Sequence, residues 1–180
     1  MIFKKNPQEE FGKIYDEYIE KIYRFVFLKT NSVETAQDIV SETFLRGWKA
    51  FSKQSSNGKK IKHFSGFLYR IAKNLIIDYY RQKAKVQIIS FENVTMIANN
   101  DKNFEKANRD TEIASIKKVL QKLPDDYQDI IIWHYLEDLS VPEIAQIMEK
   151  SEEAVRVQLS RALKALKTEL GVIKEPDSPS

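Results

Sequence analysis

Apolar residues recur three and four positions apart through most of this chain, the spacing that gathers side chains on one face of an α-helix. Five glycines and five prolines among 180 residues leave few points at which a helix must end. In the first half, the pattern predicts helices over residues 8–29, 31–52 and 64–83. Asn31 is the expected N-cap of the second helix, and residues 53–62 are expected to form a polar loop. The fold is therefore expected to be all-α.

The second half of the chain predicts a further group of helices. One begins near Thr111 and ends at Pro124, and the next follows that proline directly. Residues 140–143 form a capping box with a proline in the first turn, which opens a short helix through Met148. Ser151 then caps a last helix. Its apolar stripe consists of Val155, Leu159, Ala162, Leu163 and Leu166.

Between these two groups the apolar residues hold no steady period, and the turn-like sequence NNDKN occupies residues 99–103. An unstructured stretch of this length more often tethers two domains than closes a loop within one core. We therefore expect two small helical domains, residues 1–85 and 111–172. A flexible linker over residues 86–110 joins them, and a disordered tail over residues 173–180 follows.

The residue inventory argues against a catalytic or metal-binding function. Cysteine is absent, which excludes thiolate zinc sites, and the only two histidines, His63 and His134, are far apart in the sequence. Neither histidine has a serine and aspartate pattern near it, and the scattered glycines form no phosphate-binding loop. We expect no enzyme activity, no metal site and no cofactor.

The chain also lacks the marks of membrane insertion or export. Its longest apolar runs are four residues, whereas about 20 are needed to span a bilayer. The N-terminal sequence MIFKKNP contains no apolar signal core. A soluble protein of the cytoplasm is therefore expected.

Positive charge is concentrated in two stretches. Residues 46–85 contain eleven Lys or Arg and a single acidic residue, and residues 150–168 contain five Lys or Arg and two acidic residues. Each basic stretch follows an acidic one, so the distribution predicts two surfaces that face a polyanion. The alternative for either stretch alone is an ordinary solvated helix face.

The second basic stretch has the spacing of a helix-turn-helix. The short helix that ends at Met148 is expected to pack inward through Ile144, Ala145 and Met148 itself, and Ser151 opens the helix that follows. Arginine side chains read guanine edges, and small apolar groups contact thymine methyls in the major groove. The alternative is a C-terminal helix with an ordinary cationic face. The residues that lie away from its apolar stripe are Arg156, Val157, Ser160, Arg161, Lys164 and Lys167.

The first basic stretch interleaves cations with rings, which is typical of binding to unpaired nucleic acid. Asn57 in the expected loop carries an amide that can match the Watson–Crick edge of an extruded base. Core packing is the alternative role for the rings. The cations are Lys59, Lys60, Lys62, Arg70, Lys73 and Arg81, and the rings are Phe64, Phe67, Tyr69 and Tyr80.

Three segments resemble bacterial sigma factors. Residues 36–48, AQDIVSETFLRGW, resemble their stretch AEDLVQETFLRAW, and residues 64–81 follow their pattern FxxWLYRIAxNxxIDxxR with Phe67 in place of tryptophan. Residues 123–127, 135–140 and 143–145 match the second domain of the same family. The family is the sigma-70 superfamily, extracytoplasmic-function (ECF) type, which keeps only the region-two and region-four domains.

This resemblance implies a non-enzymatic subunit that binds core RNA polymerase, melts the minus-ten element and reads the minus-thirty-five element of promoter DNA. The implied partners are the clamp helices of the largest polymerase subunit, the flap of the second-largest subunit and promoter DNA, and an anti-sigma factor is a further candidate. The positions matching the polymerase-binding residues are Asp38, Ser41, Glu42 and Leu45. Those matching the minus-ten-binding residues are Asn57, Lys60, Phe64, Arg70, Lys73 and Asn74. Those matching the minus-thirty-five-binding residues are Ser151, Arg156, Val157, Ser160, Arg161 and Lys164.

One departure from the family pattern has a structural consequence. Glu149 and Lys150 stand where the family commonly has a glycine and an apolar residue between the two helices of the second domain. If Glu149 takes a left-handed conformation there, that conformation costs about 1 kcal/mol.

Two other functions remain compatible with the sequence alone. One is a stand-alone helix-turn-helix regulator whose first half senses a signal or forms a dimer. The other is an enzyme that processes nucleic acid, although neither basic stretch contains an acidic metal cluster.

Overall fold

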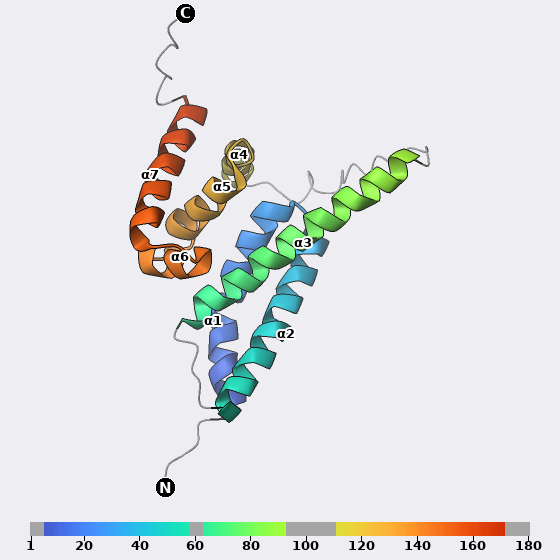
Figure 1. Ribbon diagram of the computed structural model, residues 1–180, viewed down its shortest axis with the longest axis vertical. Helices are drawn as coiled ribbons and strands as arrows, with labels where there is room; N and C mark the ends of the chain where they lie inside the picture. Colours follow the sequence, from blue (N-terminus) through green and yellow to red (C-terminus); the bar gives the residue numbers. More distant parts are fainter. Residues whose placement is uncertain (1–5, 58–62, 93–110, 172–180) are drawn as a thin grey trace, which may run out of the picture. The chain divides into compact units, whose positions relative to one another are not determined.

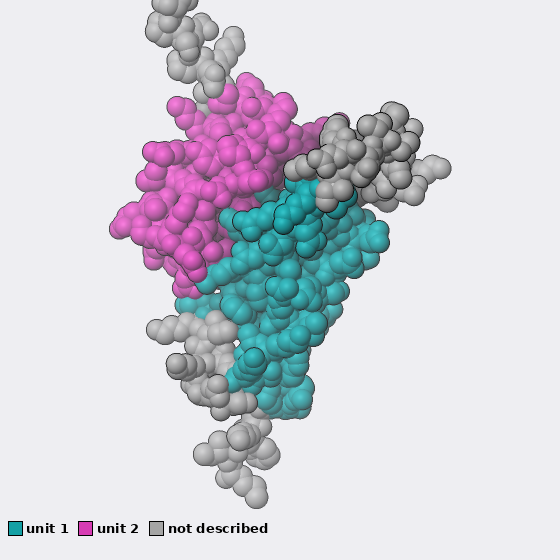
Figure 2. Space-filling model, turned by 45° about the vertical axis from the view of Figure 1, so that its right-hand side comes forward, with its two compact units in different colours: residues 1–102 teal, residues 103–180 magenta. Residues whose placement is uncertain are grey.

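A computed structural model describes residues 6–57, 63–92 and 111–171, and no strand occurs among them. The chain divides into two compact units, Met1–Lys102 and Asn103–Ser180, shown in teal and magenta in Figure 2. The first unit contains α1 (Pro7–Thr30), α2 (Val33–Asn57) and α3 (Phe64–Glu92), labelled in Figure 1. The second contains α4 (Thr111–Leu120), α5 (Asp125–Ile131), the π-helix η1 (Ile132–Leu136), α6 (Val141–Met148) and α7 (Glu152–Glu169). The prediction of an all-α fold with two helical domains is confirmed.

The connection between α1 and α2 differs from the prediction. Asn31 is not the N-cap of α2 but the C-cap of α1, with a left-handed φ of 59° and its N–H donating to the Phe27 carbonyl at 3.0 Å. Asparagine tolerates this conformation better than most residues, so the chain can turn there. The capping hydrogen bond of α2 comes instead from the next residue, because Ser32 Oγ accepts from the Thr35 N–H at 3.2 Å.

Two helices extend beyond their predicted ends. α2 continues to Asn57 instead of residue 52, so the start of the predicted loop is helical. α3 continues to Glu92 instead of residue 83, so the predicted linker begins with helical residues 86–92. Neither extension contains glycine or proline, and an existing helix propagates through such residues. Apolar periodicity misses these turns because it reports burial, and residues 81–86 are all exposed.

The core of the first unit is formed where its three helices meet. Ile22, Phe25 and Val26 of α1 and Leu68 and Tyr69 of α3 are fully buried. Phe25 and Tyr69 meet edge to face with ring centroids 5.8 Å apart. Of the two roles that the sequence left open for the rings of the first basic stretch, Tyr69 therefore takes core packing.

Gly47 lies where α2 packs against Leu68 of α3. A Cβ atom at this position would lie 2.7 Å from Leu68 Cδ2, and the Leu68 side chain is fully buried. Overpacking a core typically costs about 1–3 kcal/mol, and alanine in a helix regains about 1 kcal/mol over glycine. We expect Gly47→Ala to lower the free energy of unfolding of the first unit by about 1 kcal/mol, measured by urea denaturation.

Gly12 of α1 provides the matched control. A Cβ atom there would meet nothing within 4 Å. Gly12→Ala should therefore raise the free energy of unfolding by about 0.5–1 kcal/mol through helix propensity alone. An equal gain for both variants would show that the contact between Gly47 and Leu68 is not tight.

The second unit is built around a buried tryptophan. Trp133 in η1 is fully buried, as are Ile130 of α5, Ile144 of α6 and Val155 of α7. The helix predicted after Pro124 is present, but its last turn widens into the π-helix η1, a form that often marks functional positions.

The turn between α6 and α7 follows the prediction. The capping box of Ser140 and Glu143 begins α6, and Glu149 takes the left-handed conformation with φ 54°. Ser151 Oγ accepts from the Ala154 N–H at 3.2 Å and begins α7. One detail is wrong: Ile147, rather than Met148, is the buried residue at the end of α6.

Candidate nucleic-acid and protein interfaces

The outer face of α2 gathers the four residues predicted to bind core polymerase. Asp38, Ser41 and Leu45 are exposed, and Leu45 keeps 47% of its surface accessible although it is apolar. Glu42 is half-buried, and its Oε1 lies 2.6 Å from Arg46 Nε, one turn further along. The other face of α2 is buried in the core. The face therefore carries two acidic side chains, one of them paired with Arg46, beside an exposed leucine. Such a face suits a basic protein surface that also offers an apolar contact.

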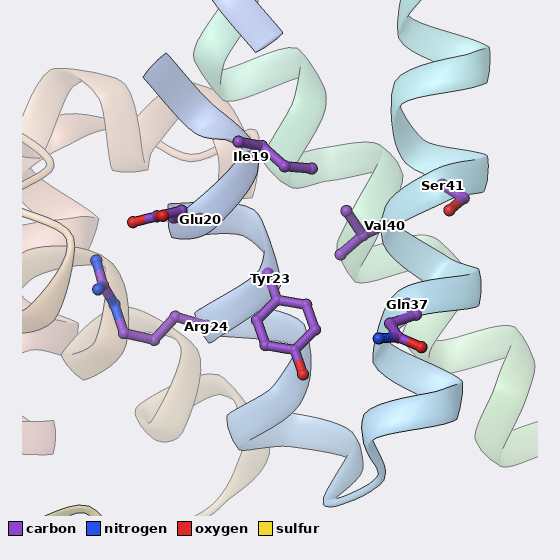
Figure 3. Close-up of a pocket in the computed structure, with 7 residues that line it drawn as sticks. All are labelled: Ile19, Glu20, Tyr23, Arg24, Gln37, Val40 and Ser41. Carbon is purple, nitrogen blue, oxygen red and sulfur yellow. The ribbon is translucent and has the colours of Figure 1, made fainter. Parts of the chain in front are cut away.

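A groove of about 510 Å³ runs beside this face, between α1 and α2. In Figure 3, Ile19 and Tyr23 of α1 face α2, whereas Glu20 and Arg24 point away from it. Ser41 belongs both to the groove and to the predicted polymerase-binding face. Sequence reasoning missed the contribution of α1, because the groove exists only where two helices meet and no local pattern marks it.

The exposed side of α3 brings together three of the six residues predicted for the minus-ten element. Arg70, Lys73 and Asn74 follow helical spacing on one face, with Asn74 exposed and the other two half-buried. Asn57 is the last residue of α2 rather than part of a loop, which corrects the prediction that it lies in a flexible loop. Lys60 lies outside the described residues.

The remaining candidate on this surface, Phe64, is engaged in aromatic packing. Its ring meets Phe11 and Phe51 edge to face, with centroids 6.0 Å and 5.4 Å away, and Phe67 at 5.6 Å. Tyr80 is also held in place, because its hydroxyl donates to the Lys29 carbonyl at the end of α1. Both rings keep some surface accessible.

The exposed face of α7 carries the six residues predicted for the minus-thirty-five element. All of them are exposed, and Val157 keeps 50% of its surface accessible. Arg156 Nη2 lies 2.9 Å from Glu152 Oε2 one turn earlier in the helix. Ser151 has a second task as the N-cap of α7, so its hydroxyl is already used as an acceptor.

The turn that precedes α7 is held by side chains as well as by its backbone. The Lys150 N–H donates to the Ala145 carbonyl at 3.0 Å, and Lys150 Nζ donates to Gln158 Oε1 at 2.8 Å. These bonds fix the start of α7 relative to α6, which is the arrangement of a helix-turn-helix. The cationic face of α7 therefore projects from a rigid support.

The described residues offer no group of three or more His, Cys, Asp or Glu side chains that could hold a metal ion. None of the described helices is long and apolar enough to cross a membrane.

In the second unit, burial removes water from Lys117 of α4 and lowers the pKa of its ammonium group.

Family models match both units. The model Sigma-70 region 2 matches residues 14–86, and the model Sigma-70, region 4 matches residues 113–166. The chain is 32% identical over 176 residues to the ECF RNA polymerase sigma factor SigW of Bacillus subtilis, a match that covers 93% of this chain and 92% of that protein. It is 30% identical over 159 residues to the ECF RNA polymerase sigma factor SigM of the same species, covering 86% of this chain and 91% of that protein.

Two solved structures share the fold. The structure of CnrH in complex with the cytosolic domain of CnrY has a TM-score of 0.66 at 20% identity, covering 97% of this chain and 92% of that one. The structure of the sigma factor RpoE with the anti-sigma factor NepR, from Bartonella quintana, has a TM-score of 0.65 at 20% identity, covering 92% of this chain and 99% of that one.

Proposed function

Since the chain belongs to the ECF type of the sigma-70 family of RNA polymerase sigma factors, it directs promoter-specific transcription initiation by core polymerase, and we propose that it divides this work among three helix faces. In this proposal the outer face of α2 binds core polymerase, the exposed side of α3 acts on the minus-ten element, and α7 reads the minus-thirty-five element. The observation that carries it is the exposure of the α7 cations on a rigid helix-turn-helix.

The polymerase contact is assigned to α2 because of its charge and its exposed leucine. Asp38 and Glu42 lie one turn apart, and opposite charges across an interface steer and stabilise association. In this proposal the clamp helices of the largest polymerase subunit lie opposite this face, as the family resemblance implies. Leu45, which has no core to join, supplies the apolar contact. The flap of the second-largest subunit is the partner that the resemblance assigns to the second unit.

The contact with the minus-ten element is assigned to Arg70, Lys73 and Asn74. Two cations bind phosphates, and the exposed amide of Asn74 offers both a donor and an acceptor to a base edge. We expect Lys73→Ala with Asn74→Ala to reduce promoter opening about tenfold or more, because a hydrogen bond to a charged group such as a phosphate is worth about 1.5–3 kcal/mol. Permanganate footprinting of the holoenzyme on a cognate promoter measures opening.

The matched control removes the same charge and a similar amide further along α3. Lys83→Ala with Gln82→Ala changes two exposed residues that do not share the face of Lys73 and Asn74. This control should open promoters normally, and both double variants should assemble with core polymerase. Normal opening by the Lys73 and Asn74 variant would mean that this face of α3 does not contact the melted strand.

An anti-sigma factor is included in the proposal as a regulatory partner. RpoE, which shares the fold, was solved with the anti-sigma factor NepR. A surface for such a partner is available here, because the exposed α2 face and the groove beside it offer acidic, aromatic and apolar groups together. A protein covering that surface would block polymerase without touching α7.

The chain itself supplies binding and no bond-breaking chemistry in this proposal, and it acts in the cytoplasm, where polymerase meets the chromosome.

Reconstitution tests the whole assignment. Purified chain with core polymerase should produce run-off transcripts from a cognate promoter, and core polymerase alone should not. A stand-alone regulator would instead bind duplex DNA without polymerase, and a nuclease would cleave DNA in the presence of a divalent metal.

A further inference from the structure

The turn between α6 and α7 carries a cation that reaches along α7. Lys150 Nζ donates to Gln158 Oε1 at 2.8 Å, although the two residues are eight positions apart. The backbone of Lys150 is fixed as well, because its N–H donates to the Ala145 carbonyl at 3.0 Å and the preceding residue, Glu149, has a left-handed φ of 54°. The Lys150 side chain therefore lies along the first turns of α7, with its ammonium group beside Gln158.

The bond between these two side chains leaves the pair with donors to offer. An ammonium group has three N–H donors and no acceptor, so Lys150 keeps two donors beyond its bond to Gln158. The Gln158 amide turns its oxygen toward the ammonium group, which directs its NH₂ group away from Lys150. The pair thus presents several N–H groups and one positive charge together, which suits an anionic oxygen acceptor such as a phosphate.

Gln158 lies at the edge of the exposed face of α7. Its helical neighbours on one side, Ala154 and Arg161, are exposed. Its neighbours on the other side, Val155 and Ala162, are buried. A helix with its side chains is about 10–12 Å across and the major groove is about 12 Å wide, so the middle of the face meets the bases and its edges meet the phosphates. A donor group at this edge is therefore placed for the DNA backbone.

We propose that Lys150 and Gln158 together bind one phosphate of the minus-thirty-five element. Lys150 supplies the charge and positions the amide of Gln158, whose NH₂ group donates to the same phosphate. The site rests on the proposed function, in which α7 reads this element, and it adds two residues to the six predicted for it. Because Lys150 stands where the family commonly has an apolar residue, the site belongs to this chain rather than to the family pattern. Such a contact fixes the register of α7 on the duplex without selecting a base.

A scan with neutral phosphates tests the site. Holoenzyme containing the full-length chain is bound to a cognate promoter in which the phosphates of the minus-thirty-five element are replaced, one at a time, by uncharged methylphosphonates. The natural chain should lose about tenfold in affinity at the phosphate that the pair binds, as expected for a lost hydrogen bond to a charged group. Lys150→Met and Gln158→Leu should each bind the unmodified promoter more weakly. Both should be insensitive to the methylphosphonate at that one position and remain sensitive at the others.

The matched controls make the same changes outside the helix-turn-helix. Lys118→Met and Gln121→Leu alter exposed residues of the second unit, in α4 and directly after it, and both should keep the natural pattern of sensitivity. Lys150→Arg, which keeps the charge and the donors, should keep it as well. The base preference of the Lys150→Met and Gln158→Leu holoenzymes in the minus-thirty-five element should equal that of the natural chain, and circular dichroism should show every variant folded.

Two results would overturn the site. If Lys150→Met and Gln158→Leu stay sensitive at every phosphate to which the natural chain is sensitive, the pair only braces the turn. If Gln158→Leu instead relaxes the preference for one base pair, Gln158 reads a base edge. Arg156→Ala separates these results from a failure of the proposed function. Impaired promoter binding by Arg156→Ala, with the pair variants unchanged, would remove this site alone, whereas normal binding by all three variants would also remove α7 from the minus-thirty-five element.

Discussion

Reversing both acidic residues on α2, Asp38→Lys with Glu42→Lys, is expected to abolish assembly with core polymerase while leaving the chain folded. Like charges placed across an interface cost several kcal/mol, which corresponds to at least a hundredfold loss of affinity. Asp38 is exposed, and Glu42 loses only its surface pair with Arg46, so the free energy of unfolding should change by about 1 kcal/mol or less. Pull-down with core polymerase measures the first effect, and urea denaturation measures the second.

The matched control reverses two acidic residues on α1. Asp16→Lys with Glu17→Lys makes the same change in net charge on exposed positions of the same unit. It should still assemble, which separates a local contact from the effect of overall charge. Normal assembly by the Asp38 and Glu42 variant would remove α2 from the polymerase interface.

Arg156→Ala is expected to have the opposite profile, with assembly intact and promoter recognition impaired. A good contact between arginine and a base edge is worth about 1–3 kcal/mol of discrimination, so transcription from the cognate promoter should fall about fivefold to a hundredfold. The preference for the contacted base should disappear with it. Run-off transcription from the cognate promoter and from single-base variants in the minus-thirty-five element measures both.

The ion pair between Arg156 and Glu152 suggests a second variant, Glu152→Gln, whose effect on DNA binding should be opposite to that of Arg156→Ala. In the free chain Glu152 Oε2 lies 2.9 Å from Arg156 Nη2, so the pair occupies one of the donors that Arg156 can offer to a base. Glu152→Gln weakens a surface pair worth about 0.3–0.5 kcal/mol and removes a negative charge facing DNA, so binding should strengthen about twofold or more. Loss of polymerase binding by Arg156→Ala in a folded chain would contradict the division of work proposed for the two units.

Local signals predicted the caps of the second unit well. The capping box at Ser140, the Ser151 cap and the left-handed Glu149 all depend on residues within a few positions of one another. The same kind of signal failed at Asn31, because asparagine favours both an N-cap and a left-handed C-cap. Local chemistry allowed both roles, and the backbone of the folded chain adopts the second.

The candidate faces were predictable to the extent that they depend on helix geometry. Once residues 152–169 are helical, the spacing alone separates the cations of α7 from Val155 and Ala162. The exposure of Asp38 and Leu45 followed in the same way from the apolar residues on the other side of α2. These assignments needed no knowledge of what the helices pack against.

The sequence by itself determined the helices, their faces and the order of the two units, because each depends on residues three or four positions apart and on short capping motifs. Only the tertiary structure decided which rings are core, since Tyr69 is buried by contact with Phe25 on another helix. It also decided where the groove of the first unit lies. Tyr23 of α1 and Ser41 of α2 line that groove together, and these two helices meet only in the folded chain. The physical reason is that burial is a property of pairs of surfaces, and the pairing of distant segments is not encoded in the period of either one.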